Sequence, residues 1–187
     1  MNRISGTLFF LAFFPYIYAI ATHQTTPSPV SWAIWASVDT LTLLAMKKEG
    51  GAPIGQITGA VAGAWVTTIL AIIFGKPTMG SVEWISIIGA AAGIILWQKT
   101  NNAVLAIVCS QLAIFLGAFP TFVDAYREPW REDIIAWTIW LVSCIFALCA
   151  VKKWNLAEAL QPITFTVVES VVFELVVIRP LFHYYLY

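Results

Sequence analysis

The sequence predicts an all-α, polytopic membrane protein with seven transmembrane helices, built as two parallel three-helix repeats plus one linker helix. Three observations predict this fold class: the apolar composition, the number of long apolar segments and an internal repeat. Of the 187 residues, 60% are hydrophobic and 11% are charged, and the mean hydropathy is +0.82. Because soluble domains carry about 25% charged residues, we expect the lipid bilayer to surround this chain.

Seven apolar segments are long enough to cross the hydrocarbon core, which takes about 20 helical residues. They lie at residues 5–22, 30–46, 54–75, 82–98, 103–123, 133–151 and 159–178. The first segment also has the length of a signal peptide, but it has a counterpart in the second half of the chain. We therefore expect it to be part of the fold.

Several helix boundaries and one packing surface can be predicted from local chemistry. Ser28 and Pro29 suit the N-cap and the first residue of the second helix. Glu132-Asp133 suits the positive end of the sixth helix dipole. The third segment carries glycine at every fourth position from 55 to 63, a pattern that favours close packing of helices.

The two halves of the chain repeat each other at an offset of 105 residues. Residues 5–56 and 110–161 share 14 identities in 52 positions, against roughly one in ten expected for two equally apolar sequences. The identical pairs include Pro15 and Pro120, Trp32 and Trp137, Trp35 and Trp140, and Gln56 and Gln161. The first three helices therefore correspond to the last three.

The repeat predicts how the chain is divided. One helix, an odd number, separates the two copies, so both have the same orientation in the membrane. We expect a first triple-helix repeat at residues 1–78, a linker helix at 79–101 and a second triple-helix repeat at 102–187.

This arrangement resembles the PQ-loop superfamily, which includes the SWEET sugar transporters, and the PnuC vitamin transporters share it. The resemblance covers nearly the whole chain. It depends on the 3+1+3 order, the proline inside the first helix of each repeat, and the Ser/Trp-rich start of the second. Where members often carry Pro-Gln, this chain has Pro15-Tyr16 and Pro120-Thr121. The resemblance implies a solute path between two helix bundles, with Pro15 and Pro120 as hinges.

One face of the second helix is a candidate solute site. Trp32, Trp35 and Asp39 follow i, i+3, i+7 spacing and so share that face. A carboxylate inside the membrane costs about 2.5–3.5 kcal/mol, so it normally faces a cavity, a partner or a proton path. The equivalent positions of the second repeat are Trp137, Trp140 and Cys144. Two alternatives stay open: tryptophans near a helix start also form interfacial belts, and Asp39 can have a structural, hydrogen-bonded role.

The last segment carries two more carboxyl groups, Glu169 and Glu174. They are five residues apart, roughly 140° around a helix, so we expect only one of them to face any single cavity. The predicted substrate-binding residues are Trp32, Trp35, Asp39, Trp137, Trp140 and Glu169.

The sequence argues against several classes of function. It contains no nucleophile elbow, zinc motif or phosphate-binding loop, so we do not expect an enzyme. Cys109, Cys144 and Cys149 lack the spacing of metal ligands, and we expect neither a metal ion nor a cofactor. The net charge is zero and the basic residues are scattered, which excludes a nucleic-acid partner.

We expect a membrane transporter of a small polar solute, sugar-, vitamin- or amino-acid-like, that works by alternating access. The alternative is a non-transporting membrane sensor or assembly scaffold. The expected partners are the solute and membrane lipid. The sequence leaves open whether the chain forms a homo-oligomer. Six of the ten basic residues fall on the side that holds the N-terminus, which favours a cytoplasmic N-terminus in the cell membrane. These six are Arg3, Lys47, Lys48, Lys99, Lys152 and Lys153.

Overall fold

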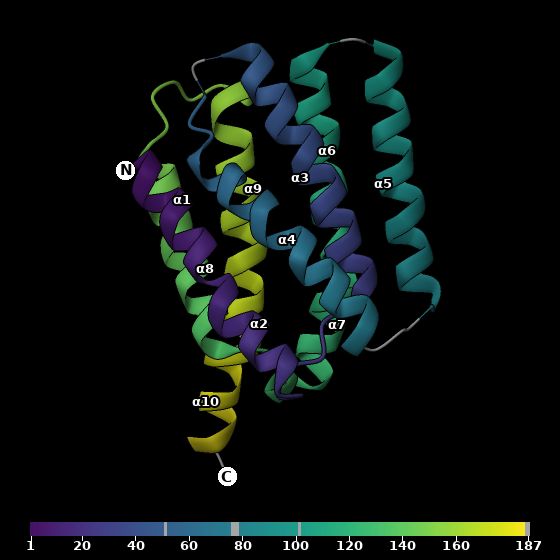
Figure 1. Cartoon of the computed structure of the whole chain (residues 1–187), viewed down its shortest axis with the longest axis vertical. Helices are drawn as coiled ribbons and strands as arrows, with labels where there is room; N and C mark the ends of the chain where they lie inside the picture. The colour runs from purple at the N-terminus through teal and green to yellow at the C-terminus, as the bar shows by residue number, and fades with distance from the viewer. Residues whose placement is uncertain (51, 76–78, 101, 186–187) are drawn as a thin grey trace.

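The computed structural model describes the chain except for residues 51, 76–78, 101 and 186–187 (Figure 1). The described residues form helices and connecting turns, with no strand among them. In chain order the helices are α1 (Asn2–Leu11), α2 (Phe13–Ala21), α3 (Pro29–Glu49), α4 (Gly55–Phe74), α5 (Ser81–Thr100), α6 (Ala103–Gly117), α7 (Phe119–Arg127), η1 (Pro129–Arg131), α8 (Ile134–Leu148), α9 (Leu156–Phe173), η2 (Glu174–Ile178) and α10 (Arg179–Tyr185).

Four helical stretches of the described chain have the length and hydropathy of a membrane span. They are Asn2–Ala21, Pro29–Glu49, Gly55–Phe74 and Val104–Arg127. The apolar helix α8 is shorter, and its 15 residues reach roughly 22 Å. The structure therefore confirms an all-helical protein suited to a membrane, while the full set of seven spans stays a prediction.

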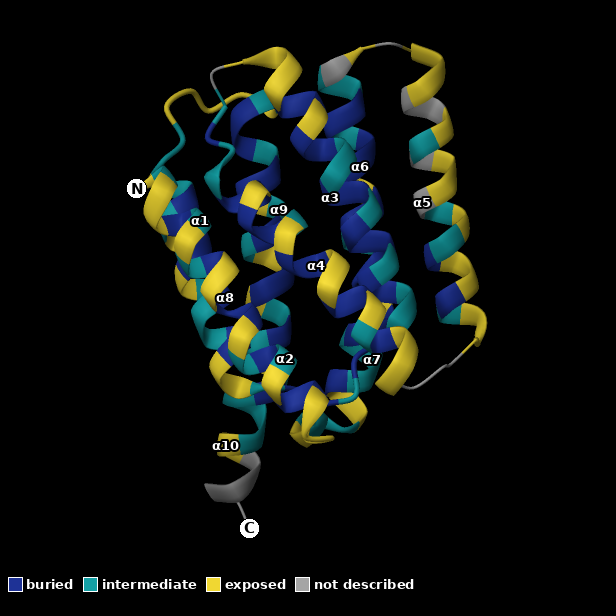
Figure 2. Ribbon diagram, in the orientation of Figure 1, coloured by how far each residue is buried: buried dark blue, intermediate teal, exposed yellow. Residues whose placement is uncertain are grey.

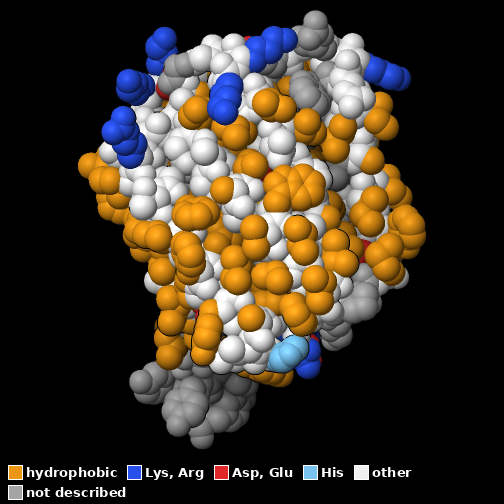
Figure 3. All heavy atoms as spheres, in the orientation of Figure 1, with side chains coloured by type: hydrophobic (Ala, Val, Ile, Leu, Met, Phe, Trp, Pro, Cys, Tyr) orange, Lys and Arg blue, Asp and Glu red, His pale blue; other side chains and the backbone are white. Residues whose placement is uncertain are grey.

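The outer surface of the bundle is strongly apolar. Large aliphatic side chains such as Ile69, Ile72 and Ile85 are exposed, and apolar side chains cover the middle of the molecule (Figure 3). The buried residues lie along the inner faces of the helices (Figure 2). A soluble monomer rarely exposes so large an apolar surface, so this pattern fits a chain surrounded by lipid.

Two long helical stretches, α1–α2 and α6–α7, are each interrupted near a proline. The break between α1 and α2 lies at Ala12, three residues before Pro15, and that between α6 and α7 lies at Ala118, two residues before Pro120. Each proline thus stands in the first turn of the second piece, where its missing N–H costs least. Whether these sites act as hinges stays a prediction.

The break before α7 is compensated by a neighbouring helix. Pro120 cannot donate to the carbonyl of Leu116, four residues earlier. That carbonyl instead accepts a hydrogen bond of 2.8 Å from the Ser86 hydroxyl of α5. Since a membrane offers no water to solvate a free carbonyl, this hydrogen bond supplies the donor that the Leu116 carbonyl lacks at the kink.

The glycines of α4 allow a close approach of α1. A Cβ atom added at Gly59 would lie 2.5 Å from the carbonyl oxygen of Gly6 and 3.3 Å from the backbone nitrogen of Phe10. Both neighbours are backbone atoms, which cannot move aside as a flexible side chain does. The GxxxG pattern therefore serves helix packing, as predicted.

We predict that Gly59→Ala forces α1 and α4 apart and lowers the free energy of unfolding by about 1–3 kcal/mol. Thermal unfolding in detergent would measure the change. The control is Thr58→Ala at the neighbouring exposed position, which should unfold at the wild-type temperature. Equal midpoints for the two variants would contradict the tight contact.

Candidate functional site

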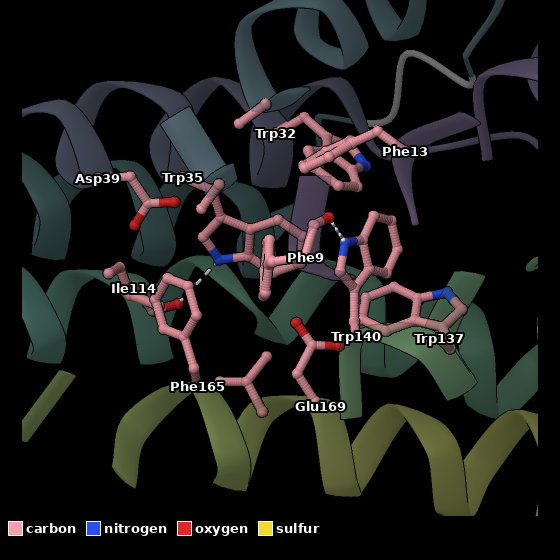
Figure 4. A pocket seen from close by; sticks show the side chains of 13 residues that line it. Phe9, Phe13, Trp32, Trp35, Asp39, Ile114, Trp137, Trp140, Phe165 and Glu169 are labelled. Carbon is pink, nitrogen blue, oxygen red and sulfur yellow. Dashed lines mark hydrogen bonds between the residues drawn. The ribbon is translucent and has the colours of Figure 1, made fainter. Parts of the chain in front are cut away.

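All six residues predicted from the sequence to bind a substrate line one cavity (Figure 4). Its volume is about 30 Å³, which is room for one or two water molecules. The wall also includes residues that the sequence did not single out: Phe9, Phe13, Ala60, Ala64, Ile114, Phe165 and Val168. The wall thus combines residues from both halves of the chain, and it includes seven aromatic rings.

The four cavity tryptophans are buried in the protein interior. Their side chains are between 1% and 7% exposed. The rings of Trp32 and Trp35 lie 5.1 Å apart between centroids, those of Trp137 and Trp140 lie 5.0 Å apart, and Trp32 and Trp140 are 5.8 Å apart. Because the rings contact one another rather than the outer surface, the alternative of an interfacial belt does not describe them.

Two hydrogen bonds of the cavity wall join the two halves of the chain. Trp35 of α3 donates its Nε1–H to the carbonyl of Ile114 in α6, at 3.1 Å. Trp140 of α8 donates to the carbonyl of Phe9 in α1, at 3.0 Å. Both donors and both acceptors differ by 105 positions, the offset of the sequence repeat. Figure 4 shows the two bonds as dashed lines.

Two carboxyl groups face the aromatic rings of the cavity, one from α3 and one from α9 (Figure 4). Asp39 is 4% exposed and Glu169 is 7% exposed. Within the described part of the chain, Asp39 Oδ1 and Glu169 Oε2 have no hydrogen-bond partner. No lysine, arginine or histidine is among the described residues of the wall. Glu174, by contrast, is exposed and does not line the cavity.

A glutamine pair lies outside the cavity wall. Gln161 donates to Gln56 Oε1 at 3.1 Å, and both side chains are buried. Gln56 in turn donates to the sulfur of Cys144 at 3.1 Å. The identity of the two glutamines at the repeat offset was the only sequence signal for this pair. It joins α4 to α9, one helix from each half.

A hydrogen-bonded cluster connects the cavity to the segment before α8. Glu132 Oε2 accepts from the Tyr16 hydroxyl at 3.0 Å and from Trp137 Nε1 at 2.8 Å. The Tyr16 hydroxyl also accepts from Trp32 Nε1 at 3.4 Å. Asp133 alone caps α8, through its Oδ1 and the backbone N–H of Ala136. Glu132 therefore serves the cluster rather than the helix end where its sequence position suggested a role.

The carboxyl group of Glu132 titrates near neutrality. Burial is the largest cause and raises its pKa from 4.5 to about 7, and the carboxylates of Asp124 and Asp133 add to the rise. The hydrogen bonds from Trp137 and Tyr16 act in the opposite direction, because they stabilise the charged form. This side chain lies between the apolar stretches Val104–Arg127 and Ile134–Leu148.

Comparison of the chain with protein-family models, with curated proteins and with solved structures finds no match. The geometry of the site therefore carries the functional argument. It combines aromatic faces, two buried carboxyl groups and walls from both halves of the chain, features that are common in small-molecule pockets.

We predict that Glu132→Gln flattens the dependence of stability on pH. The folded state of the wild type holds a proton that the unfolded state releases above about pH 4.5, so its stability falls as pH rises from about 4.5 to about 7. The pKa shift corresponds to about 3 kcal/mol over that range. The glutamine keeps a side-chain oxygen that accepts from Tyr16 and Trp137, and it cannot ionise.

Thermal unfolding in detergent from pH 5 to pH 8 would measure this effect. The variant should match the wild type at the acidic end and exceed its midpoint at the alkaline end. Parallel curves for the two proteins would show that Glu132 does not titrate in this range.

Proposed function

We propose that this chain is a membrane transporter of a small polar solute, which crosses by alternating access between two triple-helix bundles. The observation that carries the proposal is the cavity, whose wall is shared by both halves of the chain and holds two buried carboxyl groups, each with an oxygen that has no hydrogen-bond partner among the described residues. Asp39 is the eleventh of the 21 residues of α3. A carboxyl group halfway along a spanning helix marks a solute or ion pathway more often than a packing site.

The bundles of this proposal are the two sequence repeats, at residues 1–78 and 102–187, with residues 79–101 as the linker. The paired bonds Trp35–Ile114 and Trp140–Phe9 support it, because they fall at the same offset as the sequence identities. The matching breaks at Ala12 and Ala118 support it too. Seven transmembrane helices in this order fit the resemblance to the PQ-loop superfamily.

The proposed transport cycle requires the bundles to separate. A cavity of about 30 Å³ is too small for a sugar, a vitamin or an amino acid. Opening would break or shift the two indole bonds that cross between the halves, and the kinks before Pro15 and Pro120 would serve as hinges. In the open state Trp32 and Trp137 pack on the solute, together with Trp35 and Trp140. A hydrogen bond or proton coupling comes from Asp39 or Glu169.

The proposal places the protein in the cell membrane with the N-terminus in the cytoplasm. Basic side chains gather at the end of the bundle where α3 finishes, and apolar side chains cover the middle (Figure 3). Lys47 and Lys48 belong to this basic end, in the last turn of α3. An excess of basic residues on the cytoplasmic side is the usual pattern of membrane proteins.

A non-transporting sensor or assembly scaffold is the second candidate. The small volume of the cavity favours it, because a protein that carries no solute needs no larger space. Measurement of solute flux separates the two candidates.

We predict that purified protein in liposomes carries a solute and that Asp39→Asn lowers the flux about tenfold or more, since the variant loses the ionisable group and any charge-assisted hydrogen bond to the solute. A thermal-shift screen against metabolite pools would supply the solute. The matched control is Glu174→Gln, an exposed carboxyl outside the cavity, which should transport at the wild-type rate.

Wild-type flux in correctly inserted Asp39→Asn would remove Asp39 from the pathway. If none of the screened solutes crosses the membrane, the result favours the sensor or scaffold. If the carboxyl group couples transport to protons, the flux of the wild type depends on pH, and that of Asp39→Asn depends on it less.

A further inference from the structure

The hydrogen-bonding capacity of the cavity wall indicates the charge of its ligand. We propose that the solute is a monovalent organic cation, with a quaternary ammonium or similar compact cationic group that lies between the tryptophan faces and the carboxyl groups of Asp39 and Glu169. This inference rests on the proposed function in one respect, namely that the cavity is the solute site.

The first step concerns hydrogen-bond donors. The four indole N–H groups are the obvious donors of the wall, and each is already engaged. Trp35 and Trp140 donate to backbone carbonyls, Trp137 donates to Glu132, and Trp32 donates to the Tyr16 hydroxyl. The other described wall residues, apart from the two acids, are phenylalanine, alanine, isoleucine and valine. In this closed arrangement an anion therefore finds no free indole donor in the described wall, whereas the two carboxyl groups can accept from a donor on the ligand.

The second step concerns charge. Asp39 and Glu169 are buried at the cavity, and each has a buried oxygen without a partner among the described residues. A carboxylate in such a place must be neutralised, by a proton or by a cation. Since no basic side chain of the described wall supplies the positive charge, a bound cationic ligand can supply it.

The third step concerns the kind of cation. Metal ions such as Ca²⁺ or Mg²⁺ take six or more oxygen ligands, and two carboxyl groups among aromatic rings do not provide them. Aromatic faces attract organic cations electrostatically, and tryptophan does so most strongly. Trp32 and Trp140 belong to a continuous set of ring contacts with Phe13 and Tyr16. Aromatic walls are typical of quaternary ammonium recognition, and seven of the thirteen described wall residues are aromatic.

The test uses pairs of compounds that differ in charge alone. Choline and its uncharged carbon analogue 3,3-dimethylbutan-1-ol have the same shape, and tetramethylammonium and benzyltrimethylammonium extend the range of size. Titration calorimetry on the purified full-length chain should show binding of at least one of these cations, and binding of the uncharged analogue about tenfold weaker or absent. Equal binding of choline and its analogue, or no binding of any of the three cations at millimolar concentration, would overturn the inference.

Isosteric variants locate the charge. Asp39→Asn and Glu169→Gln should each weaken cation binding about 100-fold, the factor that matches the loss of one partner of a buried ion pair. Glu174→Gln, which removes an exposed carboxyl group of the same C-terminal rod, should bind as the wild type does. Wild-type affinity in both cavity variants would place the cation elsewhere. Gel filtration and thermal unfolding confirm that each variant is folded, and the comparison of charged and uncharged ligands on the wild type needs no variant.

Flux measurements distinguish this inference from the proposed function. If liposomes carry uncharged solutes but exclude all three cations, the transporter stands and the cationic ligand is wrong. If the cations bind in the cavity but no compound crosses the membrane, the ligand class stands and the transporter is wrong.

Discussion

The structure depends on one constraint: a polar group buried in an apolar bundle must find a partner, because lipid supplies none. The cavity tryptophans meet it by donating to carbonyls, to Tyr16 or to Glu132. Gln161 meets it in part, by donating to Gln56 Oε1. Asp39 and Glu169 each have a buried oxygen with no hydrogen-bond partner among the described residues, and both residues line the same cavity. Buried oxygens of serine, threonine and glutamine elsewhere in the described chain, such as Gln111 Oε1, also lack a partner, but Asp39 and Glu169 are the two carboxyl groups among them.

The same constraint explains how the bundle tolerates its kinks. Pro120 frees the carbonyl of Leu116, and Ser86 of α5 takes its place as donor. A helix outside the two proposed repeats therefore stabilises the second kink. If the kinks bend during transport, this hydrogen bond is one that the motion must keep or exchange. The linker helix then contributes to the energetics of the cycle as well as to the orientation of the halves.

The two halves of the chain correspond in two hydrogen bonds and differ in the side chains around them. The indole bonds of Trp35 and Trp140 correspond, yet Asp39 stands where the second half has Cys144, which accepts from Gln56. Tyr16, which donates to Glu132, stands where the second half has Thr121, whose hydroxyl has no partner among the described residues. The carboxyl groups of Asp39 and Glu132 therefore each belong to one half only, so the proposed pathway is asymmetric although the sequence repeats.

Local chemistry in the sequence determined the helical class, the cap at Ser28, the breaks near Pro15 and Pro120, and the shared face of Trp32, Trp35 and Asp39. These features follow from hydropathy, backbone geometry and a 100° step, which act within one helix. Only the tertiary structure decided that this face meets Glu169 in one cavity, that the indole donors are occupied, and that Glu132 contacts Tyr16. Contacts between helices in lipid depend on detailed packing, because an apolar helix surface has a similar free energy against lipid and against protein.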